Sequence, residues 1–183
     1  MTPNKFKSFV LILVSLLLVG GAVSGCKTKA EKAQSAEDQE LQNLVPDLKK
    51  RAEQGDAEAQ DTLGALYNIG EGVSKDYGEA VEWYRKAADQ GYAEAQWHLG
   101  TMYDKGEGVP QDDKEAAKWY RKAADQGDAE AQFELGKMYR KGKGVAEDDH
   151  EAVRGFRKAA GQGDAHAQYF LGVMYADGEG VPK

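Results

Sequence analysis

The residue types that most often carry chemistry in proteins are few in this chain of 183 residues. The three histidines, His98, His150 and His166, are 52 and 16 residues apart, and no His-Glu-x-x-His pattern accompanies them. The glycine-rich turn at Gly106 lacks the Gly-x-Gly-x-x-Gly or Walker spacing that holds phosphate groups. The sequence therefore predicts no enzyme, no cofactor, no metal site and no small-molecule substrate.

Cys26 is placed for a modification rather than for catalysis. Lys5 and Lys7 precede an apolar stretch at 9–19, and small residues then lead to the cysteine, an order typical of an export signal. Segment 9–23 is shorter than the about 20 apolar residues that span a bilayer. Two alternatives to a modified cysteine stay open. The segment is an uncleaved membrane anchor, or Cys26 is a lone cysteine that happens to follow a signal peptide.

The four residues 23–26, Val-Ser-Gly-Cys, resemble the lipobox of bacterial lipoproteins. The resemblance implies that residues 1–25 are a signal peptide and that Cys26 carries lipid chains, palmitate among them, which hold the protein on the periplasmic side of a membrane. Lys27 stands where an Asp would resemble an inner-membrane retention signal, so the outer membrane is the favoured location. Segment 26–40 is polar and is predicted to be a flexible tether.

The charge balance narrows the class of partner. The chain has 24 Lys and Arg against 31 Asp and Glu, a formal net charge of −7, and loss of Lys5 and Lys7 with the signal would leave −9. A negative surface disfavours nucleic acid. A single cysteine excludes an internal disulfide framework, and the length is that of one folded unit.

From residue 41 onward the sequence repeats every 36 residues. Two 14-residue words that begin at Trp83 and Trp119 differ at one position. The period is kept by the pairs Leu63-Gly64, Leu99-Gly100, Leu135-Gly136 and Leu171-Gly172. It is kept also by the Gly-x-Gly-Val turns that start at Gly70, Gly106, Gly142 and Gly178. Self-similarity at such a period predicts a solenoid.

Each repeat is predicted to hold two helices, as residues 92–127 illustrate. The first has an apolar face that contains Gly100, which indicates close approach of a neighbouring helix, and it ends at Gly106. The second begins near Asp112 or Asp113, either of which can cap its free N–H groups. Its predicted buried strip is Ala116, Trp119, Tyr120, Ala123 and Ala124.

These motifs resemble the Sel-one-like repeat, a relative of the tetratricopeptide repeat. The resemblance implies an all-α fold, a right-handed superhelix (solenoid) of antiparallel helix pairs with a concave face. Because one pair cannot bury both of its faces, it needs neighbours. The predicted divisions are an N-terminal capping half-repeat at 41–55, repeats at 56–91, 92–127 and 128–163, and a partial repeat at 164–183.

Two departures from the pattern carry predictions. Gly155 stands where the earlier repeats have Trp83 and Trp119, so that junction should pack less tightly. The final first helix, in 164–183, has no second helix after it, which fits either a natural cap or a fragment of a longer array. The paired cysteines of family members linked with β-lactam binding are absent, so that activity is not carried over.

A helical wheel predicts that positions 58, 61, 62, 65, 68 and 69, with their equivalents 36 residues apart, face outward and form the partner-binding surface. Phe170 and Val173 are the strongest candidates, because they are apolar where other repeats are polar. For Trp97, Phe133 and Tyr169 packing is favoured over partner contact, whereas the other candidates are explained equally well as solvated surface. The predicted residues are Trp97, His98, Thr101, Phe133, Glu134, Lys137, Tyr169, Phe170 and Val173.

Two functions are compatible with these features. The first is a membrane-anchored scaffold of the bacterial cell envelope that binds another protein or peptide on the concave surface of its repeats. The alternative is a periplasmic immunity protein that neutralises a secreted antibacterial effector, for example a lipase, because small acidic lipoproteins with such repeats include inhibitors of that kind.

Overall fold

The computed structural model describes residues 44–180, which are helical apart from turns and short connections. They belong to one compact unit that begins at Glu37. The predicted signal peptide at 1–25, the lipid attachment at Cys26 and the tether at 26–40 lie outside the described residues. So do residues 41–43 of the predicted half-repeat.

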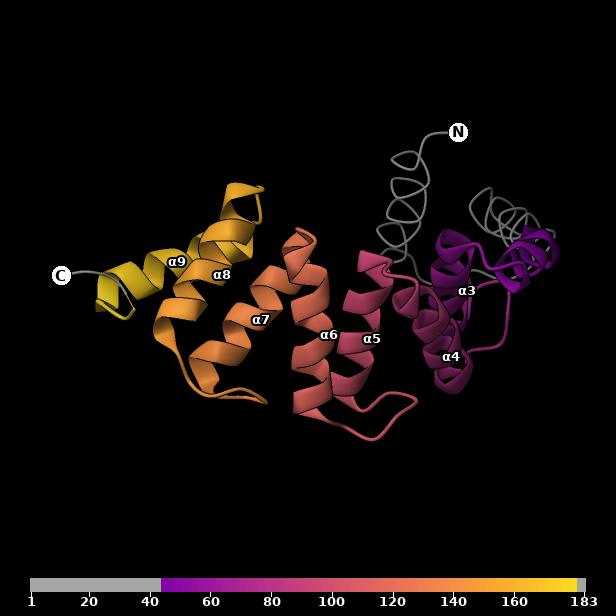
Figure 1. The fold of residues 1–183 in the computed structure, drawn as a ribbon, viewed down its shortest axis with the longest axis horizontal. Helices are drawn as coiled ribbons and strands as arrows, with labels where there is room; N and C mark the ends of the chain where they lie inside the picture. Colours follow the sequence, from indigo (N-terminus) through magenta and orange to yellow (C-terminus); the bar gives the residue numbers. More distant parts are fainter. Residues whose placement is uncertain (1–43, 181–183) are drawn as a thin grey trace, which may run out of the picture. The chain divides into compact units, whose positions relative to one another are not determined.

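Two kinds of helix alternate along the chain, and each is 13 residues long (Figure 1). The first helices of the repeats are α3 (Ala57–Ile69), α5 (Ala93–Lys105), α7 (Ala129–Lys141) and α9 (Ala165–Asp177). The second helices are α4 (Tyr77–Asp89), α6 (Asp113–Asp125) and α8 (Asp149–Gly161). A helical segment at 44–53 precedes them. Each helix packs on the next, so the predicted all-α solenoid of helix pairs is confirmed.

The helix ends lie where the sequence predicts them. Asp112 caps α6 by accepting hydrogen bonds from the N–H groups of Lys114 and Glu115. Gly106 ends α5 in the left-handed conformation at φ +71°. Aspartates occupy the capping position of every helix from α3 to α9 except α5, which begins at Tyr92 without a side-chain cap.

The glycine inside α3, α5 and α7 allows the second helix of the same repeat to pack close against it. A Cβ atom on Gly100 would lie 2.7 Å from the Tyr120 ring, which is itself 2% exposed. The predicted close approach is therefore confirmed. Of the strip predicted to be buried in α6, only Trp119 is partly exposed.

The second glycine of three turns, at positions 108, 144 and 180, makes a contact between repeats that the periodicity does not predict. Gly108, at φ +72°, packs so closely on the start of α4 that a Cβ there would overlap the carbonyl group of Tyr77. The turn of one repeat thus rests on the second helix of the preceding repeat. The same arrangement places Gly144 on Asp113.

At the opposite end of the helix pairs, buried glutamines join the repeats. Gln96 is 4% exposed, and its side-chain amide donates to the carbonyl oxygen of Ala88 over 3.0 Å. Its own side-chain oxygen accepts from Gln126, 2.8 Å away. Gln60 and Gln132 make the same pair of contacts one repeat earlier and later, so each glutamine bonds to both the preceding and the following second helix.

Candidate protein-binding surface

The nine predicted contact residues lie on α5, α7 and α9, and together they are called the first-helix surface below. All are half-buried except Tyr169, which is exposed. The prediction that position 61 faces outward is wrong, because a helical wheel treats each helix alone. Neighbouring first helices lie near each other, so a side chain at position 61 meets one at position 98, and Asp61 is only 8% exposed. A role of these residues in binding stays a prediction.

The N-terminal part of the surface is a compact polar and aromatic cluster. The Nδ1 atom of His98 lies 2.8 Å from an Asp61 carboxylate oxygen. The His98 ring stacks on Tyr84 with centroids 4.6 Å apart and lies 4.7 Å from the Trp97 ring. The imidazole is thus held from three sides, which explains why it is not freely solvated.

Two polar atoms in this cluster have no hydrogen-bond partner, the Tyr84 hydroxyl and the Trp97 indole N–H. Burial, and then the nearby Asp61 carboxylate, raise the pKa of Tyr84 above its usual value. One repeat later, the hydroxyls of Tyr120 and Thr101 lie 3.2 Å apart. The first repeat has Ala65 where the second has Thr101, which removes the corresponding partner.

The middle of the surface is charged. Lys137 pairs with Glu134 over 2.7 Å, and both side chains are about one-third exposed or less. The Lys137 ammonium also lies 5.2 Å from the centroid of the Phe133 ring. Position 137 therefore presents a positive charge whose surroundings are partly apolar.

The C-terminal part is aromatic. The Phe170 ring lies 5.5 Å from both Phe133 and Phe156, and the Arg140 guanidinium lies 5.7 Å from the Phe170 centroid. Tyr169 contacts Phe170 edge-on at 5.6 Å and is 69% exposed. Phe170 is consequently a packing residue at least in part, whereas Tyr169 offers an aromatic ring to solvent. Val173 is half-buried nearby on α9.

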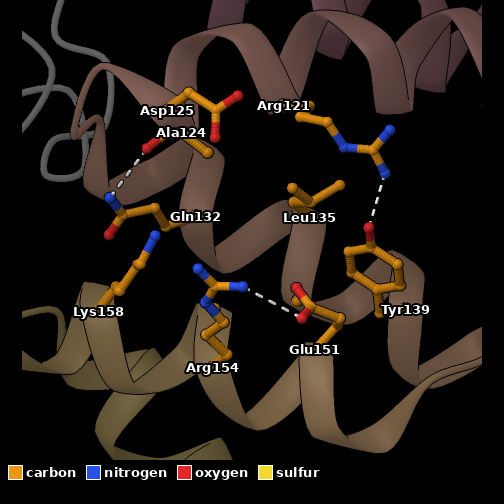
Figure 2. A pocket seen from close by; sticks show the side chains of 11 residues that line it. Arg121, Ala124, Asp125, Gln132, Leu135, Tyr139, Glu151, Arg154 and Lys158 are labelled. Atoms are coloured by element: carbon orange, nitrogen blue, oxygen red, sulfur yellow. Dashed lines mark hydrogen bonds and ion pairs between the residues drawn. The ribbon is translucent and has the colours of Figure 1, made fainter.

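Beside Gly155, where the sequence predicts looser packing, a hollow lies between α6 and α8, above α7 (Figure 2), although α8 itself packs close to α7 at this glycine. Its volume is about 110 Å³. Side chains from all three helices line it, among them Leu135, Tyr139, Arg154 and Lys158. This hollow lies on the second-helix side and contains none of the nine residues of the first-helix surface.

The other candidates for chemistry are dispersed. His150 lies 3.0 Å from the Gly180 carbonyl oxygen through Nδ1, and His166 lies 6.0 Å from the Phe133 ring centroid. Within residues 44–180, no three histidine, cysteine or acidic side chains gather closely enough to hold a metal ion. In the same range, no helix combines the length and apolar character needed to cross a bilayer.

Comparison with known proteins identifies the repeat. A sequence model described as the Sel1 repeat matches residues 57–92, 93–128, 129–164 and 165–183. No curated protein matches the chain in a sequence search.

Solved structures show the same fold. A protective antigen with an SLR fold from uropathogenic Escherichia coli strains is 47% identical, with a TM-score of 0.73 over 75% of this chain. A Sel1 repeat protein from Oxalobacter formigenes is 40% identical, with a TM-score of 0.72 over 77% of this chain. The matches span 29% and 58% of those two chains. Cysteine rich protein B of Helicobacter pylori is 24% identical, with a TM-score of 0.58 over 73% of this chain and 96% of that protein, and shows the fold alone.

Proposed function

Because the chain belongs to the Sel1 repeat family, we propose that it binds another protein along its first-helix surface and is held at the bacterial cell envelope by lipid on Cys26. Sel1 repeat proteins are scaffolds for protein–protein interaction. The extended row of side chains on successive first helices suits that role, since stacked repeats present a continuous surface.

The observation that carries the proposal is the aromatic end of this surface. Tyr169 is 69% exposed, yet its ring rests edge-on against Phe170, which is fixed by Phe133 and Phe156. A rigidly supported aromatic ring contributes contact area at low cost in side-chain entropy, so such rings are frequent anchors in interfaces. The partner is accordingly expected to cover Tyr169 with an apolar pocket.

The rest of the surface adds polar contacts around this anchor. The Glu134–Lys137 pair and the His98–Asp61 pair are half-buried, so a partner that covers them must supply matching polar groups. We expect them to determine which partner binds more than how tightly it binds.

The envelope location is supported by the order of residues 1–26, with a basic start, an apolar stretch and the Val-Ser-Gly-Cys motif. Lipid on Cys26 would place the repeats on the periplasmic side, and Lys27 favours the outer membrane. The partner is then a protein of the same compartment.

A photo-crosslinking amino acid placed at Tyr169 in living cells tests the proposal. The matched control carries the same amino acid at Ile69, an exposed apolar residue at the end of α3 that is 45% exposed. We expect a discrete crosslinked product with one protein species from position 169 and none from position 69. Equal products from both positions, or a product from position 69 alone, would contradict the proposed surface.

A further inference from the structure

Three equivalent sites on the second helices differ in one respect. In α4 the Lys86 ammonium lies 3.7 Å from the centroid of the Trp83 ring. In α6 the Lys122 ammonium lies 3.7 Å from the Trp119 centroid. In α8 the lysine is retained as Lys158, but the tryptophan is replaced by Gly155. The third repeat thus keeps the cation of a cation–π pair and lacks the ring.

The space that the ring would fill stays open. In the first two repeats the leucine of the preceding first helix is fully buried, with Leu63 and Leu99 both 0% exposed. Their counterpart Leu135 is only half-buried and lines the hollow of about 110 Å³. Figure 2 shows Lys158 and Leu135 among the side chains around this hollow. An apolar surface that is covered elsewhere in the array is therefore accessible here.

The chain cannot close this hollow with a side chain from position 155. A Cβ atom there would lie 2.8 Å from the carbonyl oxygen of Gln132 and 3.2 Å from the Cα of Gly136, because α8 packs close to α7. Position 155 therefore cannot supply the ring that the earlier repeats place at this point.

The two arginines that line the hollow are already engaged. Arg121 donates to the Tyr139 hydroxyl over 2.6 Å, and Arg154 pairs with Glu151 over 3.3 Å. Lys158 lies beside them at the rim of the hollow. Within residues 44–180 no hydrogen bond, ion pair or ring contact engages its ammonium group. Among the lining residues it is the cation that is available to a ligand.

We propose that this hollow binds an aromatic side chain, of indole size or smaller, presented by a partner protein. The ring lies against Leu135 and beneath the Lys158 ammonium, as Trp83 and Trp119 lie beneath their own lysines. The hollow of about 110 Å³ is smaller than the apolar cavity of about 150 Å³ that accepts benzene, so only part of the ring enters and the rest lies at the open mouth. The site is separate from the first-helix surface, and its test does not depend on binding there.

The probe is N-acetyl-5-fluorotryptophanamide, titrated into the full chain in detergent micelles and followed by ¹⁹F NMR, with empty micelles as the reference for partitioning. N-acetyl-5,5,5-trifluoroleucinamide serves as the non-aromatic probe. We expect saturable binding of the tryptophan probe to the wild type and a weaker response from the leucine probe. No saturable binding beyond the micelle reference, or equal binding of both probes, would overturn the proposal.

Two lysine variants give the matched comparison. Lys158→Ala should raise the Kd of the tryptophan probe about two- to fivefold, as expected for loss of one exposed cation–π contact. Lys122→Ala removes the same side chain from a site that already holds its own ring, and should leave the Kd unchanged. Equal effects of the two variants would overturn the proposal.

A third variant, Leu135→Trp, places a ring in the hollow from α7 and should abolish probe binding while retaining the helical circular dichroism. If this variant loses its helicity, the two lysine variants decide the matter, because both residues are exposed. Self-association of the wild type that the probe reverses would identify a second copy of the chain as the occupant and overturn the assignment to a different protein.

Discussion

Gly100 and Gly172 occupy the same position in two repeats, but only Gly100 has a second helix of its own repeat packed on it within the described residues. A Cβ at Gly100 would lie 2.7 Å from the Tyr120 ring, whereas a Cβ at Gly172 would meet no atom within 4 Å. Alanine at the two positions therefore changes the helix in the same way and the packing in different ways.

The expected magnitudes follow from these contacts. Replacing a glycine by alanine inside a helix stabilises it by about 0.5–1 kcal/mol, and Gly172→Ala should show that gain. At Gly100 the same gain is opposed by overpacking, which costs about 1–3 kcal/mol. Tyr120 has little room to retreat, because it is 2% exposed and its hydroxyl bonds to Thr101. The free energies of unfolding of the two variants should thus differ by about 1–3 kcal/mol.

Urea unfolding followed by circular dichroism at 222 nm measures this difference, with the wild type as reference. Gly172→Ala should unfold at a higher urea concentration than the wild type, and Gly100→Ala at a clearly lower concentration than Gly172→Ala. If both variants gain stability equally, the close approach between α5 and α6 does not constrain the fold and the packing argument is wrong.

Four further substitutions have expected outcomes. Cys26→Ala should lose acylation and move the protein from the membrane to the soluble fraction in cell fractionation; continued acylation would show that the lipobox assignment is wrong. Gln96→Ala should lower the free energy of unfolding by about 1–3 kcal/mol, because it leaves the buried Ala88 carbonyl without that bond; urea unfolding measures it, and wild-type stability would contradict the role of the glutamines. Asp128 and Asp56 cap equivalent helices but have opposite pKa shifts. Burial raises the pKa of Asp128, so the wild type loses stability as pH rises from 3.8 through that raised pKa. The stability of Asp128→Asn relative to the wild type should therefore increase over the same pH range. The Ala59 N–H and then Arg51 lower the pKa of Asp56, so Asp56→Asn should be less stable than the wild type at neutral pH, with a gap that closes as pH falls below 3.8 through the lowered pKa. Thermal unfolding of both variants and the wild type, measured over about pH 2–7, tests these two pH dependences. The same pH dependence in both variants would refute the assigned causes.

Much of the fold was predictable because the repeats make the same physical demands four times. The positions of Gly106 and Asp112 mark helix ends wherever the pattern recurs, and a glycine at position 100 and its equivalents, inside an otherwise apolar helical face, indicates that a second helix packs close by. The loss of a ring at Gly155 likewise predicts weaker packing at one junction, and the hollow lies there.

The arrangement between repeats was harder to predict. A helical wheel describes one helix, so it predicts that Asp61 faces outward. In the structure His98 of the next first helix covers that residue. The turn glycine Gly108 and the buried Gln96 recur with the period, but the periodicity alone does not reveal that both contact a neighbouring repeat. The signal that could have identified them is their invariance among positions that otherwise vary between repeats.

The turn glycines and the glutamines secure opposite ends of each helix pair, and this has a mechanical consequence. A junction between repeats that is fixed at both ends resists opening, so a bending force is distributed over the junctions of the array. The junction between α6 and α8 lacks an indole beneath its lysine and contains the hollow. When the array is stretched along its length, α6 and α8 should therefore be the first second helices to separate. A ring bound between them would make the array stiffer.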